Sequence, residues 1–350
     1  MTVKSFFPEI RGNHALRHRI GTEFFRHSFS HAYILEGPRG SGKHMLARQL
    51  AMAAACENRE SEAYPLPCGK CKVCRKIAAD NCLDVTVVKR PEDKVTMGVD
   101  TIRELRAGIA TVPNDLDVKV YVIEDAHTMT HQAQNALLLT LEEPPSFVLF
   151  LLLTEDAGSL LETVRSRAPI LRLQPIDRDT IREYLLTAPE AVTGGAPALQ
   201  RTHPEEFEAL ISLAGGSIGK ALTLLDPQTR APQMEQRAHA EEVLQHLAAK
   251  TAQDKLLLLF QSFGTGRTDV TGELAMLKLA LRDLILLTRA EGAPLLFFTD
   301  RERATELSAG FTTERLLAVC AAIEHAEAAL AANANVKLTV TRLLSELFTV

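Results

Sequence analysis

The feature that most constrains the fold is the stretch "AYILEGPRGSGKHMLARQLAMAAAC" at residues 32–56. It reads as a short apolar strand from Tyr33 to Leu35, a glycine-rich loop and then a helix rich in alanine and leucine. A loop in this context can surround phosphate groups with its backbone amides, while a lysine supplies the opposite charge. The residues that match the phosphate-loop pattern are Gly37, Gly40, Gly42 and Lys43.

The rest of the first half alternates between strand and helix patterns. Short runs rich in valine, leucine and isoleucine occur at 84–88, 118–125, 147–154 and 170–173. Amphipathic helical patterns such as "TIRELRAGI" and "QAQNALLLTLEE" separate them. This alternation predicts an α/β domain over residues 1–176, with a parallel sheet covered by helices on both faces.

Beyond "QPIDRD", which reads as a linker ending in a helix cap, the strand signal disappears. Residues 177–230 predict a small helical lid domain, with helices at 179–187, 204–214 and 217–225 and a loop at "APEAVTGGAPALQ". Residues 231–350 predict a third, all-helical domain. The last helix carries an apolar face, which indicates either a helical bundle or an oligomer interface; its residues are Val340, Leu343, Leu344, Leu347 and Phe348.

Composition limits the function classes. Hydrophobic residues make up 46% of the chain and charged residues 24%, which are ordinary globular values, and the net charge is -5. Contact with nucleic acid would therefore need a local basic face. No segment approaches the roughly 20 apolar residues of a membrane span, and the N-terminus lacks the apolar core of a signal peptide. We expect a cytoplasmic protein without membrane contact.

The cysteines predict a metal site. "CGKCKVC" contains two overlapping C-x-x-C units, Cys68, Cys71 and Cys74, and Cys56 ends the preceding helix. Four thiolates at this spacing suit the tetrahedral coordination of structural zinc, in a module spanning about residues 56–82. The alternatives are a redox dithiol and a chance cluster. Cys82 and Cys320 are expected to be packed small side chains and not ligands.

The nucleotide loop departs from the pattern of ATP-hydrolysing loops. The position after Lys43 is His44, where a hydroxyl would help to hold magnesium. The strand "VYVIED" ends in Glu124 and Asp125, the reverse of the usual Asp-Glu order. A misplacement of about 1 Å can cost ~10²-fold in rate. Thr154 ends the next strand; it suits a sensor of the terminal phosphate or a residue that satisfies its own backbone.

These residues carry a resemblance over essentially the whole chain. The stretches "HAYILEGPRGSGKH", "VYVIEDAHTMTHQAQNALLLTLEEPP", "LLLTED", "TVRSRAPILRLQP" and "LAANANVKLTVTRLLSELF", together with the cysteine insert, resemble the clamp-loader subunits of bacterial DNA polymerase III, which are AAA+ proteins. The resemblance implies an AAA+ domain, a helical lid and a C-terminal collar for oligomerisation. It also implies assembly with gamma/tau and delta subunits to load the sliding clamp onto primed DNA.

Within that family, three departures favour the non-hydrolysing delta-prime type over the gamma/tau motor type. They are His44, the swapped Glu124 and Asp125, and Gly219, which stands in "GGSIGKALTLL" where motor subunits carry a lid arginine. The resemblance thus implies a subunit without its own ATPase. An ATP-hydrolysing gamma/tau-type motor is the alternative. The sequence leaves open whether nucleotide and magnesium still bind.

Two further sites follow from the resemblance. "RSRA" at 165–168 resembles the family's Ser-Arg-Cys motif with Ala168 in place of cysteine, which implies that Arg167, or as second choice Arg165, reaches the ATP of a neighbouring subunit. A surface arginine at a helix end is the alternative. Arg103 and Arg106 share one helix face, and Arg103 suits contact with DNA phosphates, although a solvated helix face is the more common explanation of such a pair.

Overall fold

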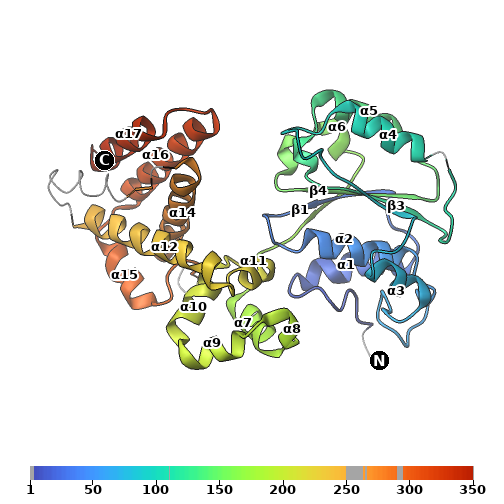
Figure 1. Cartoon of the computed structure of the whole chain (residues 1–350), viewed down its shortest axis with the longest axis horizontal. Helices are drawn as coiled ribbons and strands as arrows, with labels where there is room; N and C mark the ends of the chain where they lie inside the picture. Colours follow the sequence, from blue (N-terminus) through green and yellow to red (C-terminus); the bar gives the residue numbers. More distant parts are fainter. Residues whose placement is uncertain (1–3, 110, 250–262, 265, 290–294, 350) are drawn as a thin grey trace. The chain divides into compact units, whose positions relative to one another are not determined.

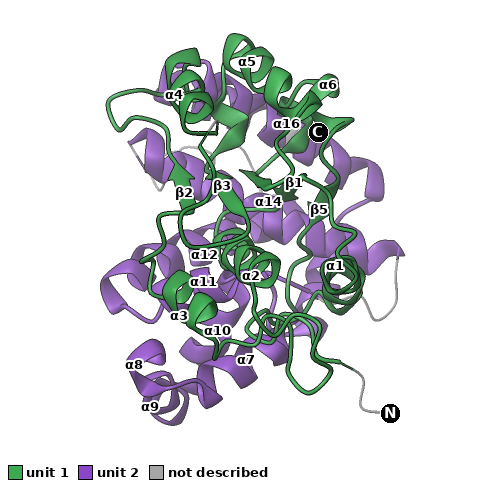
Figure 2. Ribbon diagram, turned by 90° about the vertical axis from the view of Figure 1, so that its right-hand side faces the viewer, with its two compact units in different colours: residues 1–176 green, residues 177–350 purple. Residues whose placement is uncertain are grey.

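The computed structural model describes residues 4–109, 111–249, 263–264, 266–289 and 295–349 (Figure 1). Contacts divide the chain into two compact units, Met1–Ile176 and Asp177–Val350, which Figure 2 distinguishes by colour. The second unit begins with a helix cap: the carboxylate of Asp177 accepts a hydrogen bond of 2.8 Å from the amide of Thr180. Among the described residues, none of the helices has the length and apolar character needed to cross a membrane.

The first unit is built on one parallel sheet, as the alternating pattern predicts. Its strands run in the order β2-β3-β4-β1-β5, so β1 lies between β4 and β5. Ile34 pairs with Leu152 on one side and with Ile170 on the other. The strands are β1 (Ala32–Glu36), β2 (Val85–Val88), β3 (Lys119–Ile123), β4 (Val148–Thr154) and β5 (Ile170–Arg172).

Helices cover both faces of this sheet and create two cores. In Figure 1, α1, α2 and α3 lie on one face, and α4, α5 and α6 lie on the other. Alternate strand residues point to opposite faces, so Leu35 joins the first core and Ile34 joins the second. The bounds are α1 (His14–Phe25), α2 (Lys43–Ala54), α3 (Lys72–Ala78), α4 (Val99–Ile109), α5 (His131–Glu142) and α6 (Glu162–Arg165), with 3₁₀ turns η1 (Ala126–Thr128) and η2 (Ala157–Ser159).

The second unit is helical throughout its described residues. Its helices are α7 (Arg178–Thr187), α8 (Glu190–Thr193), α9 (Ala196–Thr202), α10 (Pro204–Leu213), α11 (Ile218–Thr223), α12 (Pro227–Ala248), α14 (Arg267–Arg289), α15 (Arg301–Ala309), α16 (Thr313–Ala331) and α17 (Val336–Thr349). The loop expected at 188–200 is wrong, because α8 and α9 occupy most of it. Gly194 and Gly195 adopt positive φ between the two helices, and Pro197 stands in the first turn of α9, where it breaks no hydrogen bond.

Helix α12 passes through the expected boundary between lid and collar at residues 230 and 231. It begins at Pro227, capped by the carboxylate of Asp226, and Pro232 stands inside it. The residues at 177–350 form one compact unit by their contacts, and a finer division of that unit remains a prediction.

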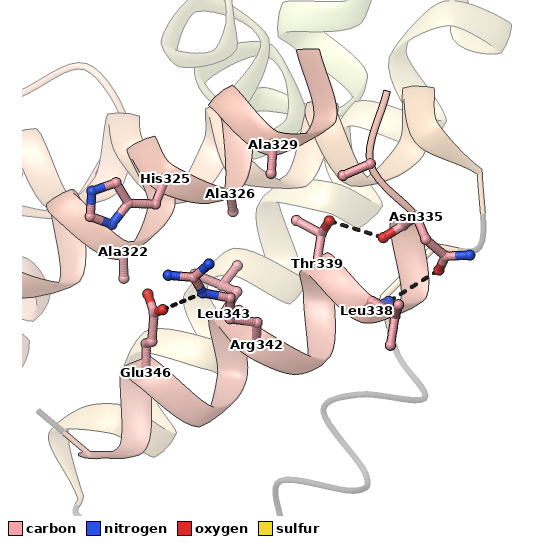
Figure 3. Close-up of a pocket in the computed structure, with 11 residues that line it drawn as sticks. Ala322, His325, Ala326, Ala329, Asn335, Leu338, Thr339, Arg342, Leu343 and Glu346 are labelled. Carbon is pink, nitrogen blue, oxygen red and sulfur yellow. Dashed lines mark hydrogen bonds and ion pairs between the residues drawn. The ribbon is translucent and has the colours of Figure 1, made fainter. Parts of the chain in front are cut away.

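The apolar face of α17 packs within the chain. Val340, Leu343, Leu344 and Leu347 are buried, while the side chain of Phe348 lies outside the described part. A groove of about 220 Å³ remains between α16 and α17. Figure 3 shows small side chains such as Ala326 along α16 facing α17, and an ion pair of 2.7 Å between Arg342 and Glu346. The helical-bundle interpretation therefore accounts for this face.

Candidate functional site

The glycine-rich loop lies at the point where the order of the strands in the sheet reverses. It follows β1, and the amide of Gly37 donates to the carbonyl of Thr154 at the end of β4, at 3.2 Å. After β1 the chain crosses to β2 at one edge of the sheet, and the last strand, β5, lies on the opposite side of β1. In α/β sheets, ligands bind at such a switch point. Gly40 and Gly42 have φ of 78° and 92°, and Gly42 is the N-cap residue of α2.

Lys43 lies inside this loop. Its side chain is buried, and its ammonium donates to the carbonyls of Gly37 at 2.6 Å and Pro38 at 3.0 Å. Burial lowers the pKa of Lys43, and the carboxylates of Glu155 and Asp125 act in the opposite direction. The lysine is therefore placed to exchange loop carbonyls for phosphate oxygens.

The two most unusual residues of the loop site are partners. The Nδ1 atom of His44 lies 3.4 Å from Oε1 of Glu124. The ammonium of Lys89 lies 3.4 Å from the same carboxylate oxygen. Glu124, where a hydrolysing site would offer its carboxylate to a metal ion, thus faces two basic side chains.

The remaining carboxylate and hydroxyl of the expected site, those of Asp125 and Thr154, differ in exposure. Asp125 is exposed and adopts a left-handed backbone with φ of 46°. Thr154 is fully buried; its hydroxyl donates to the carbonyl of Asp156 at 2.8 Å and accepts from the amide of the same residue at 3.2 Å. The Thr154 hydroxyl is therefore engaged by its own strand end.

The four predicted cysteines converge. Sγ atoms of Cys56, Cys68, Cys71 and Cys74 all lie within 4.8 Å of one another, and all four residues are buried. Cys56 comes after α2, Cys71 caps α3, and Cys74 lies in the first turn of α3. No cysteine of the chain forms a disulfide, and neither Cys82 nor Cys320 joins this cluster in the described part of the chain.

The surroundings of the sulfurs fit a bound metal. The amide of Cys71 donates to Sγ of Cys68 at 3.3 Å, and the amide of Cys74 donates to Sγ of Cys71 at 3.4 Å. The side-chain amide of Asn58 donates to Sγ of Cys68 at 3.5 Å. Donors of this kind stabilise thiolates and orient metal ligands.

The thiols also interact with one another. The hydrogen bond with Cys74 lowers the pKa of Cys56 to about 5, and the same interaction raises the pKa of Cys74. The four buried sulfurs are close enough to one another to hold one metal ion, and four thiolates are a donor set that zinc takes in structural sites generally. We therefore describe this cluster as a candidate metal centre.

Arg167 and Arg165 lie at the end of α6 and have different surroundings. The Nη2 atom of Arg167 lies 2.7 Å from Oε1 of Glu142, and its Nη1 atom donates to the carbonyl of Thr163 at 2.9 Å. Arg165 is exposed, and its side chain has no hydrogen bond or ion pair with any residue that the structure describes. Both arginines are on the surface, and only Arg167 is held in one orientation.

The other expected residues lie on open surface or in the second unit. Arg103 on α4 pairs with Asp100 one turn earlier at 3.0 Å and is otherwise exposed, as a solvated helix face would be. Gly219 lies in α11.

Sequence reasoning missed two residues of these sites, Lys89 and Glu142. Lys89 directly follows β2, and carboxyl ends of parallel strands meet at one edge of a sheet, so its position after a strand was a usable signal. Glu142 is the last residue of α5, and its contact with Arg167 joins residues 25 positions apart. No local pattern marks that contact.

The first unit is an α/β fold with a five-stranded parallel sheet and a glycine loop at the switch point, and the described residues of the second unit are helical. Residues 13–177 match the family model described as "DNA polymerase III, delta subunit", which covers the sheet-bearing unit. This match and the named relatives below make the chain similar to subunits of DNA polymerase III. They do not single out the delta-prime type.

The curated relatives carry the names of motor-type subunits. The chain is 31% identical over 220 residues to DNA polymerase III subunit tau of Bacillus subtilis, covering 63% of this chain and 37% of that relative. It is 32% identical over 220 residues to subunit gamma of Buchnera aphidicola subsp. Schizaphis graminum, covering 63% of this chain and 57% of the relative. It is 34% identical over 200 residues to subunit tau of Escherichia coli, covering 56% of this chain and 29% of that relative. The chain thus spans less than two thirds of each.

Solved structures give more distant matches. A DNA polymerase III gamma subunit-related protein of Thermotoga maritima matches with a TM-score of 0.43 and 17% identity, covering 95% of this chain and 98% of that one. The RuvB Holliday junction branch migration motor of the same organism matches with a TM-score of 0.40 and 16% identity, covering 90% of this chain and 87% of that one.

Proposed function

We propose that this chain is a subunit of the DNA polymerase III clamp loader that does not hydrolyse ATP itself. It assembles with gamma/tau and delta subunits in the cytoplasm, helps to load the sliding clamp onto primed DNA, and supplies Arg167 to the ATP of a neighbouring subunit. The cysteine cluster holds one structural zinc ion, which orders the insert between α2 and β2. These roles are those of a delta-prime-type subunit.

The contact between Glu124, His44 and Lys89 carries the proposal. A magnesium ion in a hydrolytic loop needs oxygen ligands, and a histidine side chain is a poor substitute for a hydroxyl there. The carboxylate that would hold the metal and its water faces two basic groups at 3.4 Å each. Phosphoryl transfer depends on that metal and on a positioned water, so loss of both arrangements supports a subunit without turnover.

The second candidate is an ATP-hydrolysing gamma/tau-type motor. The names of the curated relatives favour it, since each of those reported above is a gamma or tau subunit. Lys43 and the loop glycines are also those of a working phosphate loop. The residues around Glu124 favour the first candidate, and the two make opposite predictions for the isolated chain.

An ATPase assay on the purified, zinc-loaded chain decides between them. We expect no magnesium-dependent release of phosphate above the level of the Lys43→Ala variant. Steady turnover that Lys43→Ala abolishes would establish the motor. Binding of the chain to gamma/tau and delta subunits, measured by co-purification with subunit ratios, tests the assembly on its own.

The role of Arg167 is tested in the assembled clamp loader. An arginine that completes a neighbour's site contributes ~10³ to 10⁵ in rate there. Arg167→Ala should lower ATPase stimulated by primed DNA by less than this, because the other motor subunits keep their own neighbours. Arg167→Lys should restore little of this ATPase activity, because lysine lacks the planar guanidinium fork, whose two N–H donors can bind two phosphate oxygens at once. Arg165→Ala is the control, and its effect should be mild.

A further inference from the structure

The guanidinium of Arg167 is held by its own chain through three hydrogen bonds. Its Nη2 atom donates to Oε1 of Glu142 at 2.7 Å. Its Nη1 atom donates to the carbonyl of Thr163 at 2.9 Å and to the hydroxyl of Ser166 at 3.4 Å. A guanidinium has five N–H donors in a rigid plane, so two donors remain, one of them on Nε.

This arrangement orients the Arg167 side chain and leaves two of its N–H donors available. Two donors are the number that a planar fork needs to bind two oxygens of one phosphate group. An arginine free on the surface would have to give up side-chain rotamer freedom on contact, whereas Arg167 has already lost much of that freedom. The held fork is thus prepared for an anion that a neighbouring molecule brings.

Glu142 stands where a carboxylate is unfavourable for its own helix. It is the last residue of α5, and the C-terminal end of a helix carries partial negative charge. The ion pair is partly exposed, with 46% of the Glu142 side chain and 34% of the Arg167 side chain accessible, so its contribution to folding is small. The clearest physical effect of this contact is therefore the orientation of Arg167.

We propose that Glu142 is a positioning residue for Arg167. Together with the carbonyl of Thr163, it keeps the guanidinium fork in the orientation that meets the outer phosphate of a neighbour's ATP. The inference rests on the proposed function of Arg167 in trans and adds a residue from a different helix to that site. Glu142 itself touches neither nucleotide nor reacting atoms.

A double-mutant cycle in the assembled clamp loader tests this role. The variants are Glu142→Ala, Glu142→Gln, Arg167→Ala and the double variant Glu142→Ala with Arg167→Ala. The matched control is Glu143→Ala, because Glu143 is an exposed carboxylate one residue further on whose side chain forms no hydrogen bond or ion pair with a described residue. The measurements are kcat and KM for ATP with primed DNA, with zinc content and melting temperature as checks of folding.

Glu142→Ala should lower the part of kcat that depends on Arg167 about threefold to tenfold, because a misplaced fork loses transition-state contacts. Glu142→Gln keeps an acceptor oxygen without the charge, so its loss should be smaller. KM should change less than kcat in both variants. The double variant should be no slower than Arg167→Ala alone, and Glu143→Ala should match the parent.

The outcomes separate the two proposals. If Arg167→Ala has no effect, the proposed action of Arg167 on a neighbour's ATP is wrong, and the proposed role of Glu142 is wrong with it. If Arg167→Ala lowers turnover but Glu142→Ala does not, or if the two losses add, Arg167 acts without Glu142 and only this inference is overturned. A rise in turnover with Glu142→Ala overturns it as well, since the carboxylate would then compete with phosphate for the arginine.

Discussion

The Nδ1 atom of His44 lies 3.4 Å from the carboxylate of Glu124, so the two residues that depart furthest from a hydrolytic loop face each other. They are 80 positions apart in the chain and come from the start of α2 and the end of β3. Lys89, after β2, contacts the same carboxylate. Three residues that lie far apart along the chain thus form one cluster, and substituting one of them leaves the other two in place.

His44→Thr alone should not produce an ATPase. The substitution returns the loop hydroxyl, but Lys89 still pairs with Glu124, and Asp125 remains exposed with its left-handed backbone. We expect phosphate release by this variant, measured with the isolated chain and magnesium, to stay at the level of Lys43→Ala. Turnover that appears with His44→Thr and disappears when Lys43→Ala is added would show that the hydroxyl was the only missing part.

The native chain should contain one zinc ion, which Cys71→Ser removes. Three thiolates hold the metal poorly, and Sγ of Cys71 also accepts the amide of Cys74 at the start of α3. We expect metal analysis to show loss of zinc together with a lower melting temperature. Cys82→Ser and Cys320→Ser are the controls and should retain zinc. Full stability of Cys71→Ser without metal would argue against a structural role.

Asp84→Asn should destabilise the first unit. The buried carboxylate of Asp84 accepts the amides of Asn114 at 2.7 Å, Asp115 at 2.7 Å and Leu116 at 2.9 Å. An amide side chain cannot accept all of these bonds, so we expect a loss of about 2 kcal/mol in the free energy of unfolding at neutral pH. Asp93→Asn, on exposed surface, is the control and should be neutral.

The same carboxylate should make stability depend on pH. Burial raises the pKa of Asp84, but the hydrogen bonds from three backbone amides outweigh burial and lower it overall. A folded-state pKa below the unfolded value adds stability above that unfolded value, near pH 4, and the gain is lost as the pH falls through the folded-state pKa. Denaturant titrations should therefore show the gap between parent and Asp84→Asn closing in acid. A constant gap would assign the loss to packing.

Asp283→Ala should strongly destabilise the second unit. Asp283 is fully buried in α14, and its carboxylate accepts the amides of Leu296 at 3.0 Å, Phe297 at 2.7 Å and Phe298 at 3.2 Å. Removal leaves buried amides without acceptors, at a cost of about 3 kcal/mol or more. The comparison is Arg282→Ala, which removes only the partly exposed partner of this carboxylate. Equal losses from both variants in denaturant unfolding would contradict this account.

The sequence by itself determined the parts that depend on neighbours along the chain. A strand, a glycine loop and a helix follow each other at residues 32–54 because hydrophobic spacing and glycine act locally. The cysteine knuckle is likewise visible from spacing, since three of its four sulfurs lie within seven residues. Local signals failed at 188–200, where prolines and glycines punctuate two short helices and do not form one open loop.

Only the tertiary structure decided which distant side chains meet. The order β2-β3-β4-β1-β5 brings the ends of β2 and β3 together beside the loop, and this order sets the contacts of Glu124 with Lys89 and His44. The packing of α5 and α6 on one face of the sheet likewise sets the contact of Glu142 with Arg167. Contacts of this kind follow from how whole elements pack, because helix and strand patterns specify which face of each element is buried and leave open which neighbour that face will meet.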